Sequence, residues 1–166
     1  MYPEYLVSPM RQELVNAGFE DLRTPEEVDQ AIKSEGTVLV MVNSVCGCAA
    51  RSARPGAILS MLNGVVPDEY VTLFAGMEKE AVDHFRKKYL QGLTPSSPNI
   101  ALFKNGQLLH ILQRYQVEGR TAGEIAKELA GAFDKICNKK NSPEEIDKLK
   151  KYIVNRYQVS IESLNT

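Results

Sequence analysis

One continuous apolar run limits the possible folds of this chain more than any other feature. Residues Thr37 to Val42 read TVLVMV, with β-branched or apolar side chains and no alternation of polar ones. A strand with one solvated face would alternate, whereas an unbroken run suits a strand covered on both faces. We therefore expect a central strand here, inside an α/β sheet.

Helical and strand patterns alternate around this run. Thr24, Pro25 and Glu27 form a capping box with proline at the first helical position, which predicts a helix that ends by Gly36. Apolar spacing predicts further helices at residues 7–17, 49–62, 78–90 and 121–137, and further strands at 70–74, 99–103 and 108–112. The order is two helices, then β-α-β-α, then two strands and a last helix.

Two local signals refine this pattern. Pro55 lies inside the helix expected at 49–62 and predicts a kink or a restart there, because proline removes a backbone donor. The sequence Lys104-Asn105-Gly106-Gln107 is a strong hairpin signal, so the strands on either side of it should pair antiparallel. Together these signals predict an α/β fold with three α/β/α layers and a mixed central sheet.

The composition turns polar from about Asn138 onward. Ser142 opens a second capping box with Glu145, and the helix that follows carries Ile146, Leu149, Ile153 and Tyr157 at heptad-like spacing. We interpret residues 1–137 as one domain and residues 138–166 as an appended helical extension. An apolar stripe of this kind also leaves open that the extension pairs with a partner or with a second copy of the chain.

Composition excludes several classes of function. The 166 residues are 43% hydrophobic and 25% charged, with a net charge of −1, which offers no basic footprint for nucleic acid. No apolar run approaches the length that spans a bilayer, and the first residues lack the layout of a signal peptide. We expect a cytoplasmic protein, whose three cysteines serve chemistry more often than structure.

Cys46 and Cys48 stand one residue apart, where the central strand ends and a helix begins. Free N–H groups and the helix dipole at such a position favour an anion and therefore a thiolate. Arg51 and Arg54, one to two turns along, would add positive potential. Cys46 is the natural nucleophile and Cys48 the natural resolving thiol.

Gly47 separates the two cysteines. A disulfide across one residue requires the chain to turn sharply, and glycine permits backbone angles that other residues resist. A ring this small should be strained and easily reduced. The spacing thus predicts a labile, redox-active bond.

Other interpretations of the cysteines remain open. The pair is also compatible with two small buried hydrophobic residues, or with a metal or iron–sulfur site completed by Cys137, His84 or His110. Structural zinc sites usually carry a second cysteine pair, which this chain lacks. We expect His110 to be a hydrogen-bonded sheet residue, His84 to be exposed and Cys137 to be a packed cysteine.

Four segments together resemble the bacilliredoxin family of thioredoxin-like proteins. They read TVLVMVNSVCGCAARSARP, VTLFAGMEKEA, TPSSPNIALFKNGQLL and RYQVEGR, and the similarity runs from about Met10 to Cys137. The resemblance implies a thioredoxin-like fold with added N-terminal helices. It also implies that Cys46 attacks and Cys48 resolves, and that Pro98 is the cis-proline beside the active site.

The resemblance implies an activity as well. Family members remove bacillithiol, a low-molecular-weight thiol, from mixed disulfides on protein cysteines, and some have weak disulfide isomerase activity. The implied partners are client proteins and a small thiol, and no cofactor or metal is expected. Asn43, Ser44 and the N–H groups near Gly47 are candidates for orienting the thiolate, and Pro98 for flanking the bound substrate.

Two regions depart from the family pattern. Residues 138–166 are extra relative to compact members, so the family implies no role for them. Tyr115 and Gln116 stand where the family has a more charged stretch that contains histidine, which weakens the transfer of a role to the neighbouring Glu118 and Arg120.

Overall fold

The central strand predicted from the apolar run is present in the computed structural model, which describes residues 1–33 and 35–164. β2 (Thr37–Asn43) is the middle strand of a five-stranded sheet with the order β1-β4-β2-β5-β6. β4 runs parallel to both β2 and β1, β5 runs antiparallel to β2, and β6 runs antiparallel to β5. The other bounds are Glu20–Asp21 for β1, Glu69–Phe74 for β4, Asn99–Lys104 for β5 and Gln107–Leu112 for β6.

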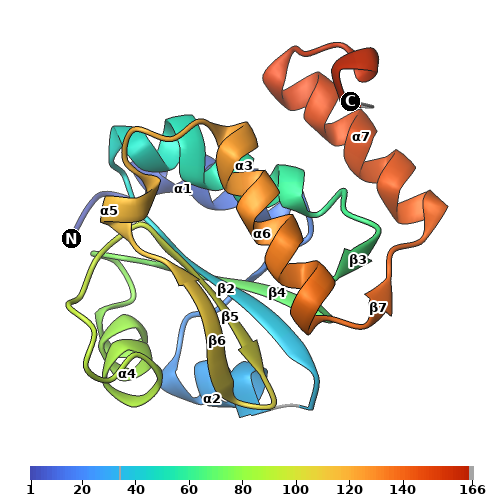
Figure 1. Ribbon diagram of the computed structural model, residues 1–166. Coiled ribbons are helices and arrows are strands. Elements are labelled where there is room, and N and C mark those ends of the chain that lie inside the picture. The colour runs from blue at the N-terminus through green and yellow to red at the C-terminus, as the bar shows by residue number, and fades with distance from the viewer. Residues whose placement is uncertain (34, 165–166) are drawn as a thin grey trace.

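Helices cover both faces of this sheet (Figure 1). One face packs against α1, α3 and α6, and the opposite face packs against α2 and α4. Their bounds are Glu4–Val15 for α1, Pro25–Lys33 for α2, Arg54–Ser60 for α3, Lys79–Tyr89 for α4 and Ala122–Ile136 for α6. The predicted α/β class with three layers and a mixed sheet is confirmed.

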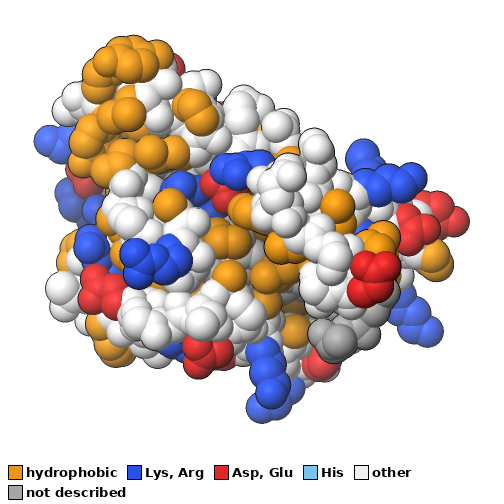
Figure 2. Space-filling view, turned by 90° about the horizontal axis from the view of Figure 1, so that it is seen from above, with side chains coloured by type: hydrophobic (Ala, Val, Ile, Leu, Met, Phe, Trp, Pro, Cys, Tyr) orange, Lys and Arg blue, Asp and Glu red, His pale blue; other side chains and the backbone are white. Residues whose placement is uncertain are grey.

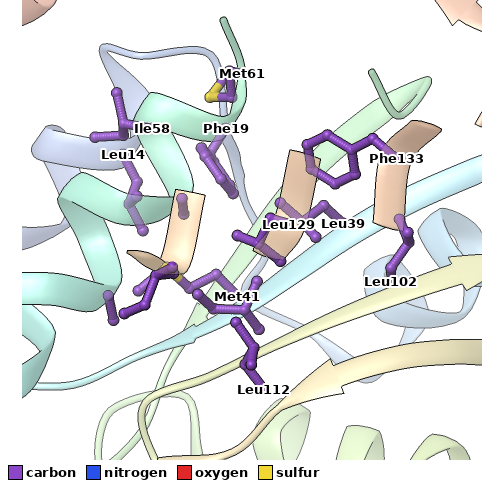
Figure 3. Close-up of a cluster of buried hydrophobic side chains, with 14 of the residues drawn as sticks. Leu14, Phe19, Leu39, Met41, Ile58, Met61, Leu102, Leu112, Leu129 and Phe133 are labelled. Atoms are coloured by element: carbon purple, nitrogen blue, oxygen red, sulfur yellow. The ribbon is translucent and has the colours of Figure 1, made fainter. Parts of the chain in front are cut away.

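The side chains of β2 divide between two hydrophobic cores. Leu39 and Met41 point into the core beneath α1, α3 and α6, together with Leu129 and Phe133 of α6 (Figure 3). Val38, Val40 and Val42 point the other way, toward α2 and α4. All seven residues of β2 are buried, which explains why the run shows no alternation.

The local signals also hold. Asn105 and Gly106 have φ values of 51° and 83°, the positive pair that a tight hairpin turn between β5 and β6 requires. Thr24 Oγ1 accepts a hydrogen bond from the Glu27 N–H, as a capping box predicts. These signals are local, so they do not depend on the rest of the fold.

The kink or restart expected at Pro55 takes the form of a π-helical turn that precedes the α-helix. Residues Ala49–Ala53 form a π-helical turn, η1, and α3 begins at Arg54. The Arg54 N–H bonds to the Ala49 carbonyl, five residues back. This wider turn suits a proline that has no N–H of its own and whose ring would clash with a carbonyl four residues earlier.

Several short elements were not predicted. They are β1, the helix α5 (Arg114–Val117), and a separate antiparallel pair formed by β3 (Val65–Val66) and β7 (Lys139–Lys140). A strand of two residues carries no periodic pattern, so only its neighbours in space reveal it.

The C-terminal extension forms α7 (Pro143–Tyr157) and a short 3-10 turn, η2 (Ile161–Leu164). Ser142 caps α7 as predicted, by accepting a hydrogen bond from the Glu145 N–H. Leu149 and Ile153 are buried in the same core as α1, α3 and α6. Most of the stripe that the sequence left available for a partner packs against this chain itself, whereas Ile146 is only partly buried. Residues 165–166 of the extension lie outside the described residues.

Charges of both signs are present on the face of the molecule that Figure 2 shows. Lys and Arg side chains lie scattered among Asp and Glu side chains on the face in Figure 2. Across residues 1–33 and 35–164, no helix is both long and apolar enough to cross a membrane.

Candidate active site

Cys46 and Cys48 lie directly after the end of β2, in the turn that leads into η1. Both are free thiols and both are half-buried. Their Sγ atoms are 2.8 Å apart, so one thiol donates a hydrogen bond to the other sulfur. The fold thus holds the sulfur atoms of Cys46 and Cys48 in direct contact.

The surroundings of Cys46 favour its thiolate. Burial acts to raise the pKa of Cys46, but hydrogen bonds from Cys48, from the Ser44 hydroxyl and from the Ala49 N–H lower it by more. The positive charge of Arg114 acts in the same direction. The net result is a pKa of Cys46 below that of an ordinary thiol.

Cys48 is affected in the opposite sense. Burial raises the pKa of Cys48, and so do its hydrogen bond to the Cys46 sulfur and the negative charges of Cys46 and Glu118. The two thiols are therefore unequal: Cys46 loses its proton first, and the proton that Cys48 keeps stabilises the Cys46 thiolate.

Arg114 is the cation that acts on both thiols, and sequence reasoning missed it. Its guanidinium pairs with Glu118 at 2.6 Å, and its Nη1 donates to the Ser97 carbonyl at 3.3 Å. Arg114 lies within the RYQVEGR segment, 66 residues beyond Cys48. Only the family segment pointed to this region, because neither spacing nor periodicity links it to the cysteines.

Arg54 has a different place from the one expected. It is 3% exposed and pairs with the equally buried Glu13, with 2.8 Å between Nε and Oε1. Its Nη1 donates at 2.9 Å both to the side-chain oxygen of Asn43 and to the carbonyl of Ser44. Arg54 therefore braces the loop before the cysteines, and its charge is paired with Glu13, a role that the sequence did not predict.

Asn43 and Ser44 form that braced loop. The Asn43 side chain donates to the Met10 carbonyl at 3.1 Å and accepts from the Ser44 N–H at 2.8 Å. Ser44 Oγ accepts from the Cys46 N–H at 3.3 Å. Ser44 thus contacts the nucleophile directly, whereas Asn43 acts on it through Ser44.

Gly47 does not use the conformational freedom expected of it in this dithiol state. Its φ lies outside the left-handed region, and it precedes Cys48, whose backbone is helical (φ −68°, ψ −31°). A Cβ atom built at Gly47 would meet nothing within 4 Å. The glycine instead leaves open space in the turn between the two cysteines.

Pro98 follows a cis peptide bond, as the resemblance implied. The β2–β5 register pairs Val42 with Asn99, so Pro98 precedes β5 at the end of the sheet where β2 leads into the cysteines. Pro98 is buried. Ser96 and Ser97, which precede it, bond to Arg114.

Two hollows lie in this region, and one of them adjoins Cys48. A cavity of about 460 Å³ is lined by Gly47, Cys48, Arg51 and Arg120, among others. A second, of about 510 Å³, is lined by Ser96, Arg114 and Tyr115, among others. Glu118 lines both, so the two hollows border the same side chain.

The remaining candidates for metal ligands lie elsewhere. Cys137 is buried and bonds to Thr37 at the start of β2, and the seven residues of that strand span about 20 Å. His110 bonds to Glu128, as a hydrogen-bonded sheet residue should, while His84 is half-buried against Asp29 rather than exposed. Among the described residues, no three His, Cys, Asp or Glu side chains form a metal-binding group.

Comparisons with known proteins find a matching family profile and similar sequences. The profile of a family described as disulphide isomerase matches residues 2–137. A bacilliredoxin of Cytophaga hutchinsonii is 48% identical over 136 residues, which cover 82% of this chain and 100% of that protein. A bacilliredoxin of Bacillus licheniformis is 50% identical over 141 residues, covering 82% and 97%.

The fold has its own comparison. A solved structure described as having a thioredoxin fold aligns with a TM-score of 0.51 at 20% identity, over 70% of this chain and 95% of that chain. The family profile ends at residue 137, so it does not cover the C-terminal extension, residues 138–166.

Proposed function

Since this chain belongs to the bacilliredoxin family and is a thioredoxin-like thiol–disulfide oxidoreductase, we propose that it removes low-molecular-weight thiols from mixed disulfides on protein cysteines. The small thiol is of the bacillithiol type and the clients are proteins of a reducing cytoplasm. The observation that carries the proposal is the inequality of the two thiols: the pKa of Cys46 is lowered and that of Cys48 is raised.

In the first step, the Cys46 thiolate attacks the small-thiol sulfur of the mixed disulfide. A new S–S bond forms between Cys46 and the small thiol, the old S–S bond breaks, and the client leaves as a thiolate. The leaving thiolate then takes a proton from solvent. Arg114 and the donors around Cys46 stabilise the attacking thiolate before this step.

In the second step, Cys48 displaces the small thiol. Once Cys46 is bonded to the small thiol it carries no charge, so the interaction with its thiolate that raised the pKa of Cys48 is gone. The Cys48 thiolate attacks Cys46 Sγ, forms the Cys46–Cys48 disulfide and releases the small thiol. A reducing protein with two thiols, or two further small thiols that leave as their own disulfide, then return the pair to the dithiol. Alternatively, a second small thiol takes the place of Cys48: it attacks the small thiol bonded to Cys46, leaves with it as a disulfide and frees the Cys46 thiolate. The same exchange chemistry would serve a weak disulfide isomerase activity.

The supporting residues have distinct roles in this proposal. Ser44 holds the Cys46 N–H and donates to its sulfur, with Asn43 behind it. Gly47 and Arg51 border the cavity next to Cys48, which leaves room for the small thiol. Pro98 flanks the client backbone at the edge of the site.

Mass spectrometry of trapped adducts tests the proposal. A Cys48→Ser variant, given a client protein that carries a bacillithiol mixed disulfide, should accumulate the small thiol on Cys46 and release the free client thiol. A Cys46→Ser variant should trap nothing, and Cys137→Ser should turn over like the unaltered protein. Failure of Cys48→Ser to trap any adduct on Cys46, with the client left modified, would contradict the proposal.

A further inference from the structure

The extension that the family profile does not cover is linked to the active-site loop through partly buried hydrogen bonds to Glu13 of α1. In α7, the Tyr157 hydroxyl donates to Glu13 Oε2 at 2.5 Å and the Tyr152 hydroxyl donates to the Glu13 carbonyl at 2.7 Å. Arg156 adds a contact of 3.3 Å to Glu13 Oε1. Three side chains of one helix thus meet at a single residue of α1.

Glu13 connects α7 to the active-site loop through Arg54. It is 4% exposed, and its Oε1 accepts from Arg54 Nε. Arg54 in turn holds the side chain of Asn43 and the carbonyl of Ser44, and Ser44 contacts Cys46. The chain of contacts therefore runs from α7 through Glu13 and Arg54 to the nucleophile, without a break and largely out of solvent.

The polar contacts are not required for covering the core. Leu149 and Ile153 already bury the apolar stripe of α7 against the core. Tyr157 supplies the donor to Glu13 Oε2, while Arg54 and Arg156 both contact Oε1. A buried carboxylate oxygen that loses its donor is costly, so the Glu13 side chain would shift and release its hold on Arg54.

We propose that α7 positions the nucleophile: Tyr157 holds Glu13 in place, Glu13 orients Arg54, and Arg54 fixes the Asn43–Ser44 loop against Cys46. This inference rests on the proposed role of Cys46. Tyr157, Glu13 and Arg54 are positioning residues, because none of them touches a reacting sulfur. The extension accordingly belongs to the reactive unit of this chain, although the family domain ends before it.

The test measures the reactivity of Cys46 rather than turnover. In a Cys48→Ser, Cys137→Ser background Cys46 is the only thiol, and the pH dependence of its alkylation by iodoacetamide reports its pKa. Tyr157→Phe removes one hydroxyl and keeps the ring. Loss of the held geometry should raise the pKa of Cys46 and slow alkylation at neutral pH by about two- to fivefold.

Two controls separate positioning from general stability. Leu149→Ala weakens the packing of α7 but keeps the polar contacts, so it should lower the melting temperature and leave the pKa of Cys46 unchanged. Tyr5→Phe alters an exposed tyrosine and should change neither quantity.

A second variant tests the same positioning role. Glu13→Gln keeps an acceptor for Tyr157 but removes the charge that pairs with Arg54, so it should raise the pKa of Cys46 as Tyr157→Phe does.

The outcomes distinguish two failures. The pKa of Cys46 could be low in the background protein and stay the same in Tyr157→Phe. That result would overturn the positioning role of α7 but not the proposed nucleophile. An equal shift in Leu149→Ala and Tyr157→Phe, in proportion to lost stability, would also overturn the positioning role. A Cys46 that titrates as an ordinary thiol in the background protein would overturn both this inference and the proposed nucleophile.

Discussion

Arg114 pairs with Glu118 through a 2.6 Å contact, and the charges of both residues act on the cysteine pair. The arginine lowers the pKa of both thiols, whereas the carboxylate raises that of Cys48. One exposed ion pair therefore adjusts the two sulfurs to different degrees.

Arg114→Gln removes the positive charge from this arrangement. The pKa of Cys46 should rise, and alkylation of Cys46 at neutral pH should slow by about two- to fivefold, a modest effect because the pair is exposed to solvent. Arg51→Gln is the matched control, since Arg51 lines the cavity beside Cys48 but is not among the charges that shift either thiol. Equal effects of the two variants would contradict the assignment of Arg114.

Cys48 is expected to stabilise Cys46 by donating a hydrogen bond. Cys48→Ala removes the donor and should reduce the thiolate fraction of Cys46 about three- to tenfold at a pH below its pKa. Cys48→Ser keeps a hydroxyl donor and should retain most of that fraction. Thiolate absorbance in the ultraviolet, followed against pH, measures the difference, and identical titrations of the two variants would show that the donor is unimportant.

The lowered pKa of Cys46 sets the direction of the pH dependence. Thiolate is present above the pKa and is lost as pH falls through it, so reduction of a mixed disulfide should decline toward acid pH. Because the pKa is lowered, the midpoint should lie below that of an ordinary cysteine thiol titrated under the same conditions. Single-turnover rates over a pH series would measure it, and a midpoint at or above that of the ordinary thiol would refute the prediction.

Two helical glycines should respond oppositely to alanine. At Gly131 in α6 a Cβ meets nothing within 4 Å, so Gly131→Ala should raise the free energy of unfolding by about 0.5–1 kcal/mol. At Gly56 in α3 a Cβ would lie 2.7 Å from Ile125 Cγ2, so Gly56→Ala should lower it by about 1–3 kcal/mol. Urea denaturation of both variants checks the pair, and a common sign would contradict the close packing of α3 on α6.

Cys137 should be dispensable for exchange. It is 5% exposed and lies in the core, so Cys137→Ala should cost about 1 kcal/mol of stability through lost packing. Trapping of the small thiol on Cys46 by Cys48→Ser should be the same with or without this change. A loss of trapping would contradict this prediction and identify Cys137 as a third redox residue.

The parts of the fold that sequence predicts well are those set by local chemistry. The TVLVMV run, the capping box at Thr24, the N-cap at Ser142 and the Asn105-Gly106 turn each depend on a few adjacent residues, and each is present in the structure. The cysteine pair is predictable for the same reason, since its place after a buried strand is written in consecutive residues.

The parts that sequence does not predict depend on distant partners. Arg54 in a helix looks like a solvated charge, because arginine is rarely buried unless it is paired. Its partner, Glu13, lies 41 residues earlier in another helix, and no spacing rule connects the two. Arg114 escapes prediction for the same reason, as only the folded chain brings its charge near the sulfurs.

The burial of β2 has a consequence for how the site accommodates a cycle of oxidation and reduction. The strand is paired on both edges and covered on both faces, so its amide protons should be among the slowest in the molecule to exchange with deuterated water. Cys46 follows this stiff segment, whereas Cys48 leads into the widened turn of η1. The atomic movements that join and separate the two sulfurs should fall on the helical side, with β2 serving as the stationary anchor.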